Sequence, residues 1–203
     1  MQLRELYLKL NLFIECNYIL NNMANKILKC FYNDGNECTI DECDYLQLEL
    51  LGRHGQGNYA LVSKASIDVV LSFKWYLGKD GYPVSYGSGN DFEINTGRGI
   101  KMHRLLKEAP KDFVVDHRNR IKLDNRLENL RICSSLQNSY NTSRKGNRYK
   151  GVRKIGKGYM AEITKAGNKY AIKDISSADE AARIYDMMAE ELFGEYAGKN
   201  FSL

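Results

Sequence analysis

The sequence predicts an α+β fold in three parts: a small β platform, a hairpin of two strands followed by a helix, and a three-stranded antiparallel sheet packed on one helix. Three observations support this prediction. Short apolar runs separated by glycine-rich turns fill residues 38–110, and two apolar runs enclose a polar loop within residues 113–142. Three further short runs then precede a segment of helical periodicity near the C-terminus.

Residues 1–37 lack the short alternating runs and are expected to form a helical extension. They are rich in Leu, Ile and Asn, and Met23 offers an alternative start. The platform is expected to occupy the following residues, with a short helix that begins at His103 and ends at Pro110. Its apolar runs are Tyr59–Val62, Val69–Leu71, Phe73–Leu77, Gly81–Tyr86 and Phe92–Ile94.

The C-terminal part, residues 147–203, is expected to be a separate domain of three strands and one helix. Residues 142–150 have no apolar periodicity and are the expected linker. Ser177 and Glu180 have the spacing of a capping box, and apolar residues recur at helical spacing until Gly194. The strands are expected at Lys150–Arg153, Tyr159–Ile163 and Lys169–Ile172, joined by hairpin turns.

The charge of the chain is unevenly distributed. The net charge is +5, but residues 97–170 alone carry 19 basic and 6 acidic side chains, a balance of +13, and the flanking segments are mildly acidic. Lys and Arg side chains near a nucleic-acid backbone neutralise phosphates and release condensed counterions. The basic segment therefore indicates a DNA-binding surface, with a solvated basic face as the alternative.

The cysteines and the apolar runs indicate an intracellular, cytoplasmic protein. The five cysteines are an odd number without the spacing of a disulfide framework, and the first twenty residues show no secretory signal. No apolar run approaches the roughly 20 residues of a membrane span, so no membrane partner is expected. Cys38 and Cys43, with Cys30 and His54 nearby, could hold zinc, but paired CxxC motifs are absent and ordinary free cysteines are favoured.

The central segment carries a set of residues suited to phosphodiester hydrolysis. This reaction requires a cation at the phosphate, a base that activates water, and a backbone held in line. Asp116 offers a hard carboxylate and Asn138 an amide oxygen, a pair suited to Mg²⁺ or Mn²⁺, while Asn141 is an alternative second ligand one helical turn away. His117 can accept the proton of the attacking water. Adjacent strand residues point to opposite faces, so a bend at the strand end is required.

This segment resembles the HNH endonucleases, whose site is a ββα-metal unit of a β-hairpin and a helix around one metal. It is most similar to the phage and intron-encoded branch, which has Asn at the third position. The resemblance implies that Asp116 and His117 are the metal ligand and the general base, that Asn129 holds the loop and orients the histidine, and that Asn138 is the second ligand. Catalytic roles are thus expected for all four residues. His103 and Arg104 are expected to be structural or to contact the DNA backbone, and Arg131 is expected to contact DNA.

The tail resembles the Apetala-type (ethylene-response-factor-like) DNA-binding domain, in motifs such as Tyr149–Arg153, Ala161–Ile163 and Leu192–Gly194. In that family a three-stranded sheet lies in the major groove and a helix supports its back. Tyr159 lies near the position of the family's usual Trp. The resemblance implies DNA contacts by Lys150, Arg153, Tyr159, Glu162, Thr164, Lys169 and Tyr170.

Together these features predict a modular nuclease that is a monomer or weak dimer and acts on double-stranded DNA. One site suits one scissile phosphate, so a nicking or homing-type enzyme is expected, and the resemblance implies a phage, prophage or bacterial context. The alternative is a non-enzymatic, sequence-specific regulator that uses the hairpin only as a scaffold. A defence or DNA-processing nuclease, in place of a mobile-element enzyme, is a further alternative.

Overall fold

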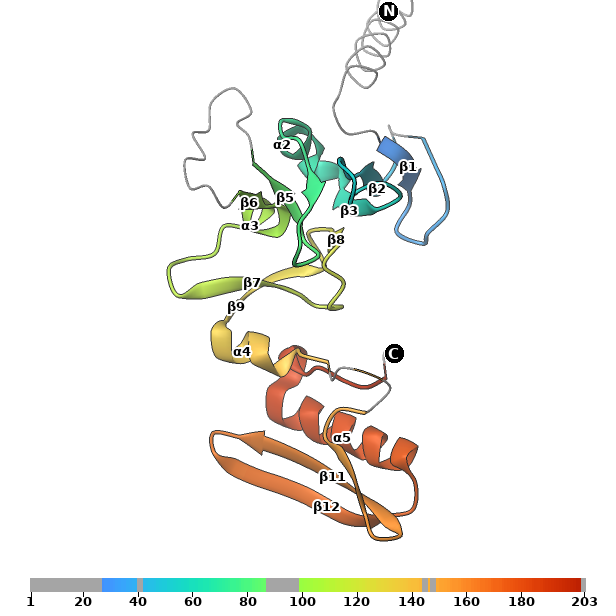
Figure 1. The fold of residues 1–203 in the computed structure, drawn as a ribbon, viewed down its shortest axis with the longest axis vertical. Helices are drawn as coiled ribbons and strands as arrows, with labels where there is room; N and C mark the ends of the chain where they lie inside the picture. Colours follow the sequence, from blue (N-terminus) through green and yellow to red (C-terminus); the bar gives the residue numbers. More distant parts are fainter. Residues whose placement is uncertain (1–26, 40–41, 87–98, 144–145, 147–148, 202–203) are drawn as a thin grey trace, which may run out of the picture. The chain divides into compact units, whose positions relative to one another are not determined.

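The computed structural model describes residues 27–39, 42–86, 99–143, 146 and 149–201 (Figure 1). The chain divides into two compact units. The first comprises residues up to 108 together with 121–131, and the second comprises residues 109–120 together with 132–203. Both contain small sheets and short helices, which confirms the α+β class. The division runs through the central segment and not through the expected linker at residues 142–150.

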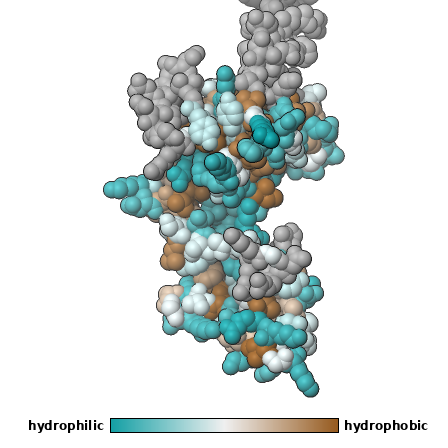
Figure 2. All heavy atoms as spheres, viewed as in Figure 1, coloured by the Kyte–Doolittle hydropathy of each residue, from teal (hydrophilic) through white to brown (hydrophobic). Residues whose placement is uncertain are grey.

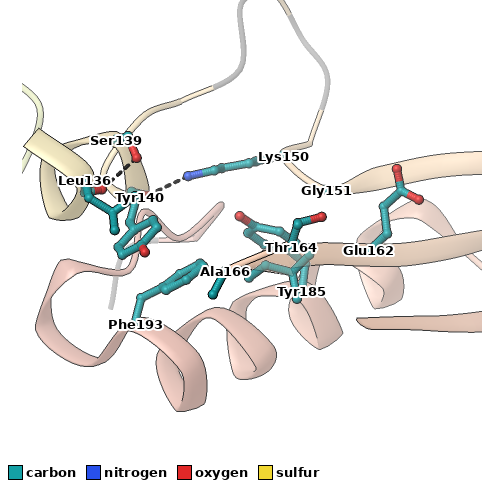
Figure 3. A pocket seen from close by; sticks show the side chains of 11 residues that line it. Leu136, Ser139, Tyr140, Lys150, Gly151, Glu162, Thr164, Ala166, Tyr185 and Phe193 are labelled. Atoms are coloured by element: carbon teal, nitrogen blue, oxygen red, sulfur yellow. Dashed lines mark hydrogen bonds between the residues drawn. The ribbon is translucent and has the colours of Figure 1, made fainter. Parts of the chain in front are cut away.

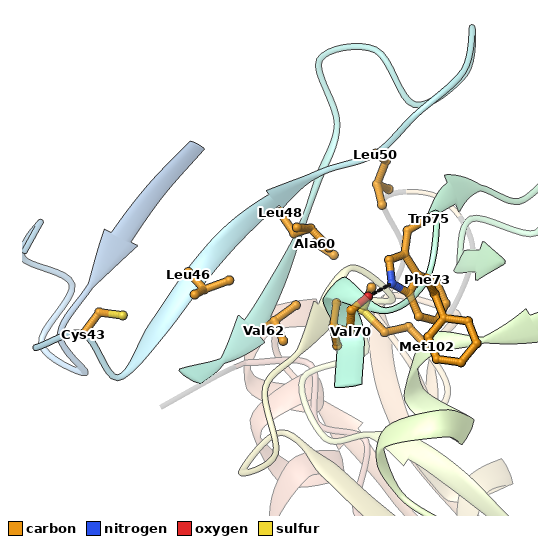
Figure 4. Close-up of a cluster of buried hydrophobic side chains, with 10 residues drawn as sticks. All are labelled: Cys43, Leu46, Leu48, Leu50, Ala60, Val62, Val70, Phe73, Trp75 and Met102. Atoms are coloured by element: carbon orange, nitrogen blue, oxygen red, sulfur yellow. Dashed lines mark hydrogen bonds between the residues drawn. The ribbon is translucent and has the colours of Figure 1, made fainter. Parts of the chain in front are cut away.

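The first unit is built on a four-stranded sheet with the order β1-β2-β3-β8. Its central strands bury alternate residues: Leu46 and Leu48 are fully buried, as are Ala60 and Val62 on the neighbouring strand, and Ser63 at the end of that strand is also buried. These side chains join Trp75, Met102 and others in one core cluster (Figure 4). The strands are β1 (Ile27–Phe31), β2 (Tyr45–Glu49), β3 (Tyr59–Ser63) and β8 (Asp124–Asn125); the first three are antiparallel, and β8 lies parallel to β3.

Two expectations for the first unit were wrong. Residues 27–31, expected in the helical extension, form β1, because the strand pairs with β2 and Phe31 stacks on Tyr45 with ring centroids 5.3 Å apart. Residues 69–71, expected as a strand, belong to helix α2 (Ile67–Leu71). Val70 is fully buried, Ile67 and Leu71 pack against the same core, and the Val70 carbonyl accepts a 2.7 Å hydrogen bond from the Trp75 indole. Residues 1–26 lie outside the described part.

A second small sheet completes the platform and leads to a short helix. Its order is β4-β5-β6, and it consists of β4 (Tyr76–Leu77), β5 (Pro83–Ser85) and β6 (Ile100–Lys101). Helix α3 (Met102–Leu106) follows directly, with Met102 fully buried. The helix ends before Lys107, which is already extended, so Pro110 does not terminate it as expected. The run expected at Phe92–Ile94 lies outside the described residues.

The second unit begins with the strand that carries the expected site. Strands β7 (Phe113–His117) and β9 (Leu130–Ser134) form a two-stranded sheet, and helix α4 (Ser135–Tyr140) follows at once. The first two residues of β9 are assigned to the first unit and the rest to the second. Ser134 caps this helix: its hydroxyl accepts from the Gln137 backbone N–H at 3.1 Å, while the Gln137 side chain accepts from the Ser134 N–H at 2.9 Å. The expected order of strand, polar loop, strand and helix is confirmed.

The C-terminal part of this unit is the expected three-stranded antiparallel sheet, in the order β10-β11-β12, covered by helix α5. Alternate residues of β11, Ala161 and Ile163, pack under the helix against Tyr185 and Ala189. Ser177 caps α5 by accepting from the Glu180 N–H at 3.1 Å. The elements are β10 (Val152–Ile155), β11 (Gly158–Lys165), β12 (Asn168–Ile175), α5 (Ala178–Phe193) and a final 3-10 turn (Gly194–Tyr196).

The end of α4 is joined to this sheet-and-helix part by several contacts. The Tyr140 ring stacks on Phe193 with centroids 3.9 Å apart. The Tyr140 carbonyl accepts hydrogen bonds from the Lys150 ammonium at 2.6 Å and from the Gly198 backbone at 3.0 Å. The last turn of α4 is therefore held by residues far along the chain, which explains why both belong to one compact unit.

One face of the described residues shows how polar and apolar side chains are distributed. In the space-filling view, hydrophobic residues occur in separate groups among hydrophilic ones (Figure 2). Within the part of the chain that the structure describes, no helix is both long enough and apolar enough to cross a membrane.

Candidate active site

Asp116 and His117 lie at the very end of β7 and are both buried, with exposed fractions of 8% and 4%. The chain turns immediately after them: the Arg120 backbone N–H donates to the His117 carbonyl at 2.9 Å, and Arg120 has a left-handed backbone with φ of 65°. The strand therefore ends in a bend at the position where the sequence required one.

The side chain of Asn141 binds the end of this strand. Its amide nitrogen lies 3.2 and 3.0 Å from the two carboxylate oxygens of Asp116, 2.9 Å from the His117 carbonyl and 3.3 Å from the Arg118 carbonyl. An amide nitrogen carries two hydrogens, so these four acceptors share them. Asn141 is 6% exposed and follows the last residue of α4. Strand end and helix end are thus joined by one buried side chain.

Asn138 lies one helical turn before Asn141, and its carbonyl accepts from the Asn141 N–H at 3.1 Å. Residues three apart on a helix share a face. Asn138 is exposed, whereas Asn141 is buried against Asp116. Asn138 therefore lies one turn from the residue that contacts the Asp116 carboxylate, and the side-chain amide of Asn138 is accessible to a ligand.

The donor chemistry of these residues fits a magnesium-like ion with few protein ligands. Mg²⁺ usually keeps several waters and substrate oxygens and takes one or two carboxylate or carbonyl ligands from the protein. Asp116 retains acceptor capacity because a carboxylate has about four lone-pair sites. Among the residues with described positions, no three His, Cys, Asp or Glu side chains are grouped to hold a metal.

The polar loop after the strand is fastened within the first unit. Asn129, 6% exposed, donates from its amide to the Asp124 carbonyl at 2.7 Å. Arg126 binds the Asp124 carboxylate with two bonds of 2.7 and 2.8 Å. The Ser63 hydroxyl accepts from the Leu127 N–H at 2.8 Å, which ties the loop to β3. The position of Asn129 agrees with a loop-holding role.

Two of the three residues expected near DNA in this part of the chain are buried. His103 is 5% exposed, and its ring lies 4.7 Å from that of Tyr82. Arg131 is also 5% exposed. A buried guanidinium or imidazole cannot reach a phosphate without leaving its site, so both positions favour structural roles. Arg104 is exposed on α3 and remains accessible.

The outer face of the C-terminal sheet carries a cluster of charges. Directly opposed residues of paired strands share a face. Glu162 and Thr164 of β11 alternate with the buried Ala161, so they point away from α5. Lys169 opposes Thr164 and binds Glu162 at 2.7 Å, and Arg153 of β10 lies 3.5 Å from the same carboxylate. The hydrogen bond from Lys169, with the nearby Arg153, lowers the pKa of Glu162.

The other expected DNA contacts of this domain lie elsewhere. Tyr159 packs against the core under α5, and Tyr170 opposes the buried Ile163, although 44% of Tyr170 is exposed. The Lys150 ammonium is bound to the Tyr140 carbonyl. Its partial burial, with the positive charge of Arg120 nearby, lowers the pKa of Lys150 to about 8. These three side chains therefore do not belong to the outer face of the sheet.

A hollow of about 460 Å³ opens between α4, β11 and α5 (Figure 3). Tyr140 and Phe193 form one side of it, and the Lys150 side chain reaches across toward the end of α4. It contains neither Asp116 nor His117. The sequence did not single out this hollow, because its lining comes from α4, β11, α5 and the turns beside them, whose packing only the fold determines.

Comparison with known proteins shows which family the central segment resembles. Residues 108–140 match the model of a family described as HNH endonuclease. A protein of Acanthamoeba polyphaga mimivirus described as an HNH endonuclease is 44% identical over 168 residues, which cover 79% of this chain and 83% of that relative. No solved structure matches the chain significantly. No match to an Apetala-type domain is among the relatives found.

Proposed function

Because this chain belongs to the HNH endonuclease family, and is therefore a nuclease, we propose that it is a metal-dependent enzyme that hydrolyses phosphodiester bonds in duplex DNA, nicking one strand per active site. Membership in this family overturns the alternative of a non-enzymatic regulator. The observation that carries the proposal is the bond network of Asn141, which joins the end of β7 to the end of α4 at Asp116. It brings the carboxylate, the imidazole-bearing residue and the amide-bearing helix into one small region.

In this proposal Asp116 and Asn138 would hold Mg²⁺ or Mn²⁺ through a carboxylate and an amide oxygen. The ion, when bound, supplies positive charge for the phosphate and the leaving oxygen. His117 accepts the proton of the attacking water at neutral pH. Asn129 keeps the polar loop closed by its bond to the Asp124 carbonyl. A single site of this kind acts on one phosphodiester, so a nick is the expected product.

We further infer that the outer face of the β10–β12 sheet binds duplex DNA. Arg153 and Lys169 are exposed there, with 59% and 56% of their side chains accessible, and Thr164 is exposed beside them. The face belongs in part to the basic segment of residues 97–170. The likeness of the tail to Apetala-type domains, which place such a sheet in the major groove, supports this assignment. Arg104 remains a candidate contact to the backbone.

A plasmid assay tests the proposed reaction. Supercoiled plasmid should be converted to the open circle with Mg²⁺ or Mn²⁺, and EDTA should stop the conversion. His117→Ala should reduce the nicking rate by about 100-fold or more, the usual contribution of a general base. Its affinity for duplex DNA in a gel-shift assay should change by less than about twofold, because His117 is 4% exposed and distant in the chain from the sheet face.

His54→Ala is the matched control, since His54 is exposed in the platform and has no proposed role. It should nick at the wild-type rate. Cleavage that persists in EDTA, or a His117→Ala variant that nicks normally, would refute the assignment. Equal loss of nicking and of DNA binding in His117→Ala would show that the histidine is structural.

A further inference from the structure

We propose that Asn141 is a positioning residue: its side-chain amide holds the Asp116 carboxylate by hydrogen bonds and does not itself bind the metal ion. This inference rests on the proposed function in one respect, the role of Asp116 as a ligand. It gives separate roles to two asparagines that lie three residues apart, of which the sequence favoured Asn138 as the ligand and left Asn141 as the alternative.

The first support is the chemistry of the contact. The amide nitrogen of Asn141 faces four oxygens: two of the Asp116 carboxylate and the carbonyls of His117 and Arg118. All four are acceptors, so only the nitrogen end of the amide can face them favourably. With the amide reversed, its oxygen would lie against the same four oxygens. The group that metal ions prefer, the amide oxygen, is therefore turned away from Asp116.

The second support is the contrast with Asn138. Asn141 is 6% exposed and its donor capacity is used by the strand end. Asn138 is exposed on the preceding turn of the same helix face. An incoming ion with its waters and a phosphate needs an accessible oxygen, which the exposed residue offers. A neutral amide also orients a carboxylate without adding a positive charge that would compete with a cation.

The third support is that the backbone at Asn141 is itself anchored. The preceding Tyr140 carbonyl accepts from the Lys150 ammonium and the Gly198 N–H, and the Tyr140 ring stacks on Phe193. On the strand side, Arg118 binds the Glu195 carboxylate at 2.8 Å. The residues that hold the backbone on both sides of the Asn141–Asp116 contact thus come from the C-terminal sheet-and-helix part. The orientation of Asp116 depends on them through Asn141.

Substitutions at the two positions test their separate roles. In Asn141→Leu the side chain loses its hydrogens without adding a charge, so the Asp116 carboxylate is no longer held, and Mn²⁺ affinity, measured by electron paramagnetic resonance on the full chain, should fall by about tenfold. In Asn138→Asp a carboxylate replaces an amide ligand, so Mn²⁺ affinity should be retained or increased. Ser139→Ala, on the exposed side of the same helix, is the control for a change in α4 alone. Unchanged Mn²⁺ binding by Asn141→Leu would overturn the proposal.

A second measurement needs no metal and no activity. Asn141→Asp should lower the melting temperature of the metal-free protein by about 4 °C or more. In the double variant with Asp116→Asn, the amide at position 116 can donate to the carboxylate at position 141. The double variant should therefore recover at least about half of the lost melting temperature. No recovery would show that the two side chains are not coupled. If the wild-type chain bound no Mn²⁺ and did not cut DNA, the proposed function would fail, while this cycle would still decide whether Asn141 holds Asp116.

Discussion

At the scale of single residues, the outer face of the C-terminal sheet combines two exposed cations with one carboxylate. Glu162 has 23% of its side chain exposed and binds Lys169 at 2.7 Å, with Arg153 at 3.5 Å. Its lowered pKa, caused first by Lys169, keeps it ionised at neutral pH. On a surface that binds phosphates this negative charge reduces the field of its neighbours, while the ion pairs hold the two long side chains in place.

Replacing Glu162 by glutamine should therefore increase non-specific affinity for duplex DNA. The change releases Arg153 and Lys169 for phosphate contacts, so the affinity should rise by about threefold to tenfold and the salt dependence should become steeper by about one counterion. Fluorescence anisotropy with a random duplex at several salt concentrations measures both. Glu191→Gln, which removes the same charge from an exposed position on α5, should have much less effect. An equal gain in both variants would indicate net charge alone, and weaker binding by Glu162→Gln would indicate that the carboxylate contacts a base.

The sequence was sufficient to propose Asp116 and His117, because a carboxylate and an imidazole at a strand end, followed by asparagines at fixed spacing, match one chemistry. It favoured Asn138 as the ligand but could not exclude Asn141, because the two share a helix face and differ only in what packs against them. Nor could it show that Arg131 is buried, since the exposure of an arginine depends on tertiary contacts. The exposed fraction of a polar side chain is therefore the property that is hardest to predict from the sequence.

At the scale of elements, the end of α4 is a site of close packing. A Cβ on Gly198 would lie 2.7 Å from the Tyr140 carbonyl oxygen and 3.0 Å from both the Thr142 carbonyl oxygen and the Lys150 ammonium. Real Cβ atoms are essentially never closer than 3.0 Å to such atoms, and two of the three are backbone. The helix end and the tail are therefore in contact at a point where only glycine fits.

Gly198→Ala should destabilise the protein by about 1–3 kcal/mol and slow nicking. The added methyl displaces the end of α4, and with it Asn141. Gly167→Ala is a control of comparable cost: Gly167 has a left-handed φ of 82° with open space around it, at the hairpin tip between β11 and β12. Differential scanning calorimetry and the plasmid assay compare the two. If Gly167→Ala slowed nicking as much as Gly198→Ala at equal stability, the effect would be global and the helix end would have no special role.

Most elements with strong local signals were predictable. The cap of α4 at Ser134 and of α5 at Ser177, and the glycine and asparagine turns of the last sheet, are set by neighbouring residues. The strand Tyr45–Glu49 was missed, although its alternation of Leu46 and Leu48 was a usable signal. Residues 27–31 and 67–71 could not be assigned with confidence from pattern alone, because a short apolar run fits a strand or a buried helical turn equally well. Their secondary structure depends on the residues that they contact in the core.

At the scale of the whole molecule, the two compact units do not follow the order of the chain. The loop of residues 121–131 pairs with the platform through β8, and the strand and helix of the site join the C-terminal part. Such a division cannot be predicted from composition, because residues 142–150 have the polar character of a linker while Lys150 binds the end of α4. Lys150 is held by a residue 50 positions away, since its backbone N–H donates to the side-chain oxygen of Asn200.

Removal of residues 147–203 tests this division directly. If the tail only bound DNA, the remaining chain would cut slowly at low DNA concentration and normally at saturation. The contacts of Tyr140 with Phe193, Lys150 and Gly198 lead to a different expectation, because the truncated α4 loses the groups that hold its last turn. Nicking at saturating DNA should therefore fall by at least about tenfold. The full-length double variant Arg153→Ala, Lys169→Ala, which keeps these contacts, should bind DNA more weakly but retain its rate at saturation. A truncated chain with the full rate at saturation would show that the nuclease site is complete without the tail.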